Sequence, residues 1–435
     1  MNFIKSTTFF FYTVYNKKRA LLFFIFLISI FVSLLFLFFF KDIGPSQHAV
    51  PGTDYLYFYE PVAESILQGK GIPVKENFAI RYPPGYPVFL SMIFYLSQLI
   101  GINKLELVVI FNIVITAFAC CFLFLIAELI FRKRIALIAS FLWLSYPFNL
   151  WFLKNPNTEV PFIFLLFLGI WFYILALKKK HSGFIFITGV ILGLASLVRP
   201  IGLLLPLLLA LMIFFLLKET SRKIQFFLAI ILLIGNLIII FPWEYYVFSE
   251  TGRLIPLSTG GPPSIAGGII WLSKEGQGGN RITLSSDVLA LTVRAENSTL
   301  NTTGDVLYFF LQELVDQPIA FFKLIGLKIV RAWYSTSQMW WEGQILAVQI
   351  LYLLTGFIGI ALGIKTLTED IKYIFFLLSV IFYFWGMTIL GLSMLRYMVP
   401  AMGFFMIFSA ITVNILLDKW NKKIRKFRQN KLKNY

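Results

Sequence analysis

Long uncharged apolar stretches dominate this chain of 435 residues. Ten of them are long enough for a helix to cross a lipid bilayer, which takes about 17 to 25 residues. They comprise residues 20–40, 107–127, 135–153, 160–177, 182–198, 200–217, 224–243, 343–364, 373–395 and 397–417. A hydrophobic fraction of 59% and a mean hydropathy of +0.81 exclude a soluble globular domain. We therefore predict an all-α, polytopic membrane protein with about ten transmembrane helices.

The distribution of charge supports this count. An eleventh apolar stretch is interrupted by prolines, which leaves only residues 88–100, too few to span, so we expect an interfacial or re-entrant helix there. The ten spans then place 23 Lys and Arg against five acids on the N-terminal side, and 15 against 16 acids on the other. Because cytoplasmic loops are enriched in Lys and Arg, we predict a multi-pass protein of the inner or plasma membrane with both termini cytoplasmic. On this interpretation the net charge of +17 does not indicate a nucleic-acid partner.

The spans divide the chain into three parts. Residues 1–243 form an N-terminal transmembrane module that includes an extracytoplasmic loop at 41–106. Residues 244–342 form a large extracytoplasmic loop, and residues 343–435 form the last transmembrane helices with a basic cytoplasmic tail. The first loop contains apolar residues at helical spacing from Tyr55 to Leu67, which predicts an amphipathic helix. The second opens with a glycine-rich stretch, predicted as a loop, and closes with the apolar, interfacial residues 306–335.

Four ionisable residues fall at the predicted outer face, where charges beside apolar segments are functional candidates. Asp54 follows the first span, and Glu159 lies in the turn before the fourth. Arg199 and Arg396 lie in two further outer turns. A carboxylate can take a proton from an attacking hydroxyl, and arginines can hold a phosphate. The set therefore suits transfer chemistry on a phosphate-linked substrate.

Structural explanations compete with each of these functional roles. Asp54 and Glu159 are also acceptable at the first turn of a helix, as caps. Arg199 and Arg396 could anchor helix ends by snorkelling. The tryptophans at 333, 340 and 341 are typical of an interfacial aromatic belt.

Several motifs, in this order, resemble a known family. The first loop contains Asp54-Tyr55, Leu67-Gln68-Gly69-Lys70-Gly71 and Arg81-Tyr82-Pro83-Pro84-Gly85-Tyr86-Pro87. Thr158-Glu159-Val160-Pro161, Leu197-Val198-Arg199-Pro200, Leu257-Ser258-Thr259 and Leu395-Arg396-Tyr397-Met398-Val399-Pro400 follow. Together they resemble the C-type (GT-C) integral-membrane glycosyltransferases, and most closely the branch with protein O-mannosyltransferases and the aminoarabinose transferase of lipid A.

This resemblance implies a transferase that takes its sugar from a polyprenyl-phosphate carrier at the extracytoplasmic face. Asp54 then matches the catalytic acid of the first loop, Glu159 the acidic position of the second, and Arg199 a cation near the carrier phosphate. The expected catalytic residues are Asp54 and Glu159. The expected substrate-binding residues are Arg81, Tyr82, Arg199, Arg396, Tyr397, Lys328 and Arg331, the last two as cations at the outer membrane surface.

The sequence also sets expectations for ligands. The chain has only two His and two Cys and lacks the Asp-X-Asp of the metal-dependent branch, so we expect neither a metal nor a separate cofactor. The expected partners are a polyprenyl-phosphate sugar, membrane lipids, and a lipid, glycan or protein acceptor. A transporter or flippase of lipid-linked sugars is the alternative, although its polar residues would lie near the bilayer midplane. A non-catalytic scaffold would not need Asp54.

Overall fold

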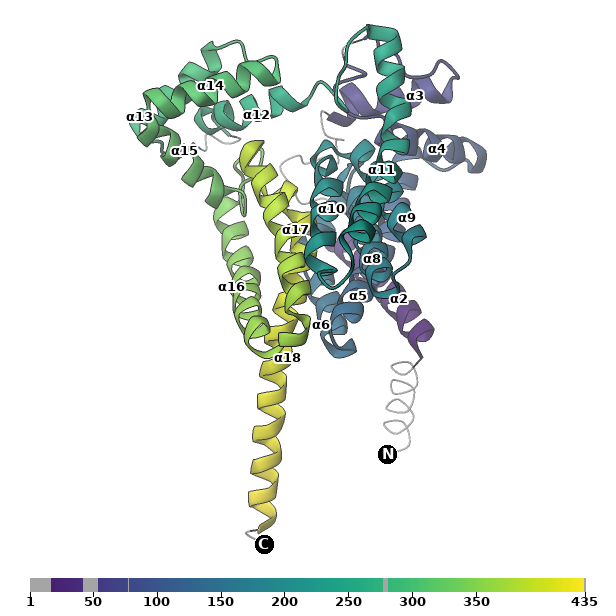
Figure 1. Cartoon of the computed structure of the whole chain (residues 1–435), viewed down its shortest axis with the longest axis vertical. Coiled ribbons are helices and arrows are strands. Elements are labelled where there is room, and N and C mark those ends of the chain that lie inside the picture. The colour runs from purple at the N-terminus through teal and green to yellow at the C-terminus, as the bar shows by residue number, and fades with distance from the viewer. Residues whose placement is uncertain (1–16, 42–53, 77, 277–280, 434–435) are drawn as a thin grey trace.

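Figure 1 shows a computed structural model of the protein, which describes residues 17–41, 54–76, 78–276 and 281–433. Within these ranges the chain is built from helices and contains no β-strand. The prediction of an all-α polytopic protein is confirmed. Residues 1–16 and the start of the first predicted loop, residues 42–53, lie outside the described residues.

The predicted spans correspond to apolar helices. Among the described residues, seven helices are long and apolar enough to cross a membrane. They are α2 (Lys18–Phe40), α5 (Lys104–Ile130), α8 (Glu159–Lys179), α11 (Arg222–Thr251), α16 (Glu342–Thr366), α17 (Ile371–Leu390) and α18 (Leu395–Lys433).

The other three predicted spans are less regular. One consists of α6 (Lys133–Leu144) followed, after a bend of 57°, by α7 (Pro147–Leu150) and the 3-10 turn η2 (Trp151–Leu153). The remaining two are the shorter apolar helices α9 (Ser182–Val198) and α10 (Leu205–Leu216). Each of the ten predicted positions therefore contains an apolar helix.

One hydrophobic core joins the early and late helices. Helix α9 packs against α8 and α11, and α18 packs against α6 and α16. The buried core residues run from Leu21 in α2 to Ile411 in α18. The first and last segments of the predicted domain organisation thus share one core, and α18 brings the late part of the chain against α8.

The basic clusters gather at one end of the bundle. Lys18 at the start of α2 forms an ion pair with Glu128 at the end of α5 at 2.6 Å, and Arg134 at the start of α6 pairs with Asp418 in α18. In Figure 1 this end lies at the bottom, whereas α3 and α12 to α15 lie at the top. The two long loops therefore share one end of the bundle, as predicted. The assignment of the basic end to the cytoplasm stays a prediction.

The first loop forms helices beside the top of the bundle. A π-helical turn, η1 (Tyr55–Tyr59), continues into α3 (Glu60–Leu67), which agrees with the predicted amphipathic helix. Helix α4 (Gly85–Ile100) packs against α3, α5 and α9. It begins three residues before the predicted Val88, because a proline such as Pro87 is tolerated in the first turn of a helix. At 16 residues it is shorter than the candidate spans.

The second loop folds around a core of its own. It contains α12 (Gly261–Ile270), α13 (Ser286–Asn297), α14 (Thr303–Asp316) and α15 (Pro318–Arg331). Residues of all four helices form a hydrophobic cluster separate from the core of the bundle. Arg294 and Glu313 link α13 to α14 through two hydrogen bonds of 2.7 Å. Residues 306–335, predicted as one interfacial stretch, are thus divided between two helices of this unit.

The prediction that the glycine-rich stretch is a loop is wrong at α12. Pro262 and Pro263 follow Gly261 in the first turn of this helix, where proline is tolerated. Gly268 lies so close to the backbone of Gly391 that an added Cβ would stand 2.0 Å from the Gly391 carbonyl oxygen. The glycine serves close packing against the α17–α18 connection, which local turn statistics do not reveal.

Candidate active site

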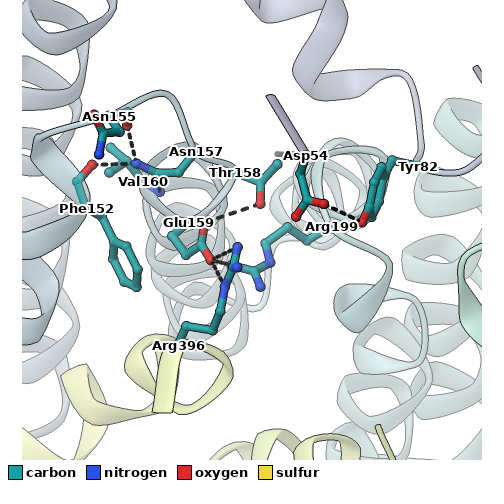
Figure 2. A network of polar contacts seen from close by, with 10 residues as sticks. All are labelled: Asp54, Tyr82, Phe152, Asn155, Asn157, Thr158, Glu159, Val160, Arg199 and Arg396. Carbon is teal, nitrogen blue, oxygen red and sulfur yellow. Dashed lines mark hydrogen bonds and ion pairs between the residues drawn. The ribbon is translucent and has the colours of Figure 1, made fainter. Parts of the chain in front are cut away.

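The four charged residues predicted at the outer face lie close to one another (Figure 2). Asp54 directly precedes η1, and Glu159 is the first residue of α8. Arg199 connects α9 to the turn before α10, and Arg396 lies in the first turn of α18. Four elements distant in sequence thus contribute one charged side chain each.

Local sequence explains two of these placements. Arg199 precedes Pro200, and a residue before proline is restricted to extended conformations; its φ of −143° and ψ of 123° end α9. At α8, the Asn157 side chain accepts a hydrogen bond from the Val160 amide at 3.1 Å. Because Asn157 satisfies this amide, the Glu159 side chain is not needed as a cap and can face the arginines.

Glu159 is the centre of a buried charge cluster. Its side chain is fully buried, and its Oε1 atom lies 2.8 Å from Nη1 of Arg199. The same oxygen accepts a hydrogen bond from Nε of Arg396 at 2.6 Å and lies 2.6 Å from its Nη2. Arg199 is itself only 6% exposed, whereas 39% of the Arg396 side chain is exposed. Simple snorkelling therefore does not describe these arginines, since both are held by one carboxylate.

Asp54 has a different environment. It is partly exposed, its backbone is helical, and its side chain makes no capping hydrogen bond. Its Oδ1 atom accepts a hydrogen bond from the Tyr82 hydroxyl at 3.1 Å. Burial, followed by the nearby Asp54 carboxylate, raises the pKa of Tyr82 to about 12, so the tyrosine stays protonated and donates. The structure shows no ion pair between Asp54 and another described residue.

Tyr59 lies between the Glu159 charge cluster and the Asp54–Tyr82 pair. Its ring lies 5.1 Å from that of Tyr82 and is almost completely buried. Burial and then Tyr82, Asp54 and Glu159 raise the pKa of Tyr59 well above its ordinary value, whereas Arg199 opposes the shift. Both carboxylates and one arginine therefore act on the same phenol.

Two further predicted substrate-binding residues belong to this group. The Tyr397 ring lies beneath both arginines, with the guanidinium carbon of Arg199 5.0 Å and that of Arg396 5.6 Å from its centre. Arg81 stands over the Phe58 ring at 5.9 Å. Its buried Nε atom has no hydrogen-bond partner within the described part of the chain. Such an atom is a natural place for a ligand oxygen.

The structure separates Lys328 and Arg331 from this group. Both were expected as cations at the membrane surface, but both are buried, with exposed fractions of 1% and 4%. Lys328 donates to the carbonyl oxygen of Gly391 at 3.0 Å, and burial lowers its pKa to about 7. Arg331 forms an ion pair with Glu342 at 2.8 Å. They face the protein because the other side of α15 carries the exposed Phe322 and Val330.

A pocket of about 250 Å³ opens beside Arg396. Its wall is mostly apolar and comes from the α7–η2 segment, the connection between α15 and α16, and the start of α18. The aromatic lining residues are Phe148, Trp151, Phe152, Trp340 and Trp341. We did not predict this pocket from the sequence. Its signal in the sequence is the adjacent pair Trp340 and Trp341, a pattern that is also typical of an interfacial aromatic belt. Trp333, expected in the same belt, is buried in the core.

Within the residues that the structure describes, no group of three or more His, Cys, Asp or Glu side chains is arranged to hold a metal ion. The expectation that the protein needs no metal or cofactor stays a prediction.

Known sequences and structures resemble parts of this chain. The sequence model of the family described as dolichyl-phosphate-mannose-protein mannosyltransferase matches residues 82–246, less than half of the chain. The search of curated proteins gave no significant match.

Among solved structures, the oligosaccharyltransferase of Archaeoglobus fulgidus in its apo form matches with a TM-score of 0.56 and 14% identity over 94% of this chain and 52% of that one. The oligosaccharyltransferase AglB from Archaeoglobus fulgidus, with an inhibitory peptide and a dolichol-phosphate, matches with a TM-score of 0.55 and 13% identity over 95% of this chain and 52% of that one. This chain thus spans about half the length of that enzyme. ArnT from Cupriavidus metallidurans, bound to undecaprenyl phosphate, matches with a TM-score of 0.42 and 17% identity over 91% of this chain and 76% of that one.

The likeness to the archaeal enzyme extends over nearly all of this chain and concerns its fold. The family match begins at Tyr82, within the candidate site, and includes Glu159 and Arg199. The chain is therefore a polytopic membrane protein with the GT-C fold, and its residues 82–246 carry the sequence pattern of the dolichyl-phosphate-mannose-protein mannosyltransferases.

Proposed function

We propose that this protein is an integral-membrane glycosyltransferase that moves a sugar from a polyprenyl-phosphate carrier to an acceptor hydroxyl. The family description and the dolichol-phosphate in one structural neighbour support a lipid-linked donor. The observation that carries the proposal is the contrast between two carboxylates. Glu159 is fully buried and neutralised by two arginines, whereas Asp54 is partly exposed and, among the residues that the structure describes, is bonded to the Tyr82 hydroxyl and to no cation.

This contrast assigns the two acids different roles. A general base must reach the proton that it abstracts and accept it, and Asp54 is placed to do so. The acceptor oxygen attacks the anomeric carbon with inversion while the bond from that carbon to the phosphate oxygen breaks. Asp54 takes the hydroxyl proton, and polyprenyl phosphate leaves. Glu159 is then a positioning residue that fixes the two guanidinium groups.

The arginines and the pocket fit the donor. Arg396 is 39% exposed and lines the apolar pocket, so it can contact a phosphate whose isoprenoid chain occupies that pocket. Arg81, with its unpaired Nε, offers a further donor for phosphate oxygens. The basic clusters at the opposite end of the bundle favour an extracytoplasmic position for the site.

Transfer by the purified protein tests this proposal. We would supply a panel of hexosyl and pentosyl polyprenyl phosphates with lipid, glycan and peptide acceptors. Asp54→Asn should lower transfer by about two to four orders of magnitude, as expected when a general base is lost. Glu64→Gln, in the following helix and paired with Lys104, is the matched control and should transfer normally.

A donor-side variant and a vesicle assay complete the test. Arg199→Ala should weaken donor use more than acceptor use, because it loses a cation near the phosphate. Near-normal transfer by Asp54→Asn would remove this aspartate from the mechanism. If reconstituted vesicles move the lipid-linked sugar between leaflets and form no glycosidic product, the transporter interpretation replaces ours.

A further inference from the structure

Residues 335–341, most of which line one side of the pocket beside Arg396, have an unusual backbone conformation. They are part of the connection between α15 and α16, and both Met339 and Trp341 have positive φ angles, of 53° and 56°. Residues other than glycine seldom adopt this left-handed region, and side chains of this size strain it. Such strain persists where the surroundings fix it, and it clusters at ligand clamps.

A single carboxylate oxygen fixes the start of this segment. Oε1 of Glu342 accepts hydrogen bonds from Nη2 of Arg331 at 2.8 Å, from the Ser335 hydroxyl at 3.0 Å and from the Thr336 amide at 2.9 Å. Arg331 is 4% exposed and the Glu342 side chain 15%, so most of this network is buried. The residue expected to bind substrate at the membrane surface instead holds the connection in place.

The segment is also tied to the candidate active site. The amide of Leu395, next to Arg396, donates to the carbonyl oxygen of Ser335 at 2.9 Å. The amide of Trp340 donates to the Thr336 hydroxyl at 3.0 Å. The segment and Arg396 therefore form one pocket wall with a common hydrogen-bonded frame.

Two stacked tryptophans line this pocket. The rings of Trp340 and Trp341 are stacked, with their centres 4.5 Å apart and their planes inclined by 6°. Trp151 stands edge-on to Trp341 at 6.3 Å, and Trp341 is 39% exposed. Large rigid rings with accessible surface beside a cation suit an amphiphile with an anionic head and an unsaturated hydrocarbon chain.

We propose that residues 335–341 form a preorganised clamp whose stacked tryptophans bind the isoprene units adjacent to the donor phosphate. This inference rests on the proposed function, because it assumes a polyprenyl-phosphate donor. It assigns Trp341 the role of a specificity-determining residue and Glu342 that of a positioning residue. The strained backbone holds the ring in place before the lipid arrives, which reduces the ordering cost of binding.

Binding of farnesyl phosphate to the full-length protein in detergent, measured by isothermal titration, tests the clamp without requiring catalysis. Trp341→Gly removes the ring and relieves the backbone strain. It should weaken farnesyl phosphate binding by about tenfold or more, as expected for a tryptophan at a binding hot spot. Its thermal midpoint should equal or exceed that of the wild type, since glycine tolerates this φ. A ring with only a structural role would give the opposite change in stability.

Lys180→Gly is the matched control. Lys180 has a φ of 52°, lies at the end of α8 among the basic clusters, and is exposed. Its substitution should raise stability by the same backbone effect and leave farnesyl phosphate binding unchanged. If Trp341→Gly does not fold, Trp341→Asn replaces it, because asparagine also tolerates the left-handed region.

The outcomes separate the clamp from the proposed function. Absence of farnesyl phosphate binding by the wild type, or wild-type affinity in the Trp341 variants, would overturn the clamp. A wild type that transfers sugar, together with a Trp341 variant of unchanged donor KM, would also reject the clamp while the transferase stands. Weakened binding in the variants of a protein that transfers no sugar would support the clamp and reject the transferase.

Discussion

Replacing Glu159 by glutamine tests the charge cluster most directly. The substitution preserves the size of the side chain but removes the negative charge that two arginines share at 2.8 Å and 2.6 Å. Removing one partner of a buried ion pair costs about 3 to 5 kcal/mol, because the remaining charge is buried without compensation. With an unfolding entropy of about 2.1 cal/mol/K per residue, a chain of 435 residues loses about 3 to 6 °C in Tm.

Thermal unfolding followed by tryptophan fluorescence in detergent provides the measurement. Glu128→Gln is the matched control, since its partner Lys18 is 52% exposed and such pairs contribute at most about 1 kcal/mol. Adding Arg199→Gln to Glu159→Gln should recover part of the loss, because it removes one uncompensated cation. If Glu159→Gln melts within 1 °C of the wild type, approximately as Glu128→Gln does, the cluster is not the buried charge centre described above.

Three further predictions concern topology, pH and packing. A cysteine introduced at residue 75 should react with an impermeant thiol reagent in intact cells and one at residue 133 should not; the reverse pattern would invert the topology. Burial lowers the pKa of Lys328 from 10.5 to about 7, so the unfolded chain binds more protons between these values and stability should rise with pH across this window, by at most about 1.4 kcal/mol per unit. Lys328→Met should flatten that rise in Tm, and an unchanged slope would contradict the assignment. Gly268→Ala should destabilise by about 1 to 3 kcal/mol because its Cβ would meet the Gly391 carbonyl at 2.0 Å, whereas Gly267→Ala, 3.8 Å from its nearest neighbour, should be neutral; equal melting temperatures would refute the contact.

The helix positions and the gathering of the site could be predicted from sequence because both follow from local signals. The long uncharged apolar stretches predict the helices. The distribution of Lys and Arg between the two sides of the membrane predicts that Asp54, Glu159, Arg199 and Arg396 lie at the same end of the bundle. The ion-pair partners of these residues could not be predicted from the sequence. Glu159 receives its two arginines from positions 40 and 237 residues away, and nothing in its own turn specifies them.

The second loop shows where sequence reasoning reaches its limit. Lys328 and Arg331 lie in an amphipathic segment, and the pattern does not say which face meets protein. Their burial depends on contacts with Gly391 and Glu342, which belong to other elements. Gly268 likewise reads as a flexible position until its tertiary neighbour is known. The pocket depends on three segments that converge only in the folded chain.

The charge inventory of the candidate site has a consequence for turnover. Asp54 and Glu159 balance Arg199 and Arg396, so these four residues are neutral together before a ligand arrives. A polyprenyl-phosphate sugar is a phosphodiester with one negative charge, whereas the released carrier is a monoester with a charge of about −1.5 to −2 at pH 7. The same arginines therefore attract the spent carrier more strongly than the donor. We expect carrier release to limit the steady-state rate, and free polyprenyl phosphate to act as a product inhibitor competitive with the donor.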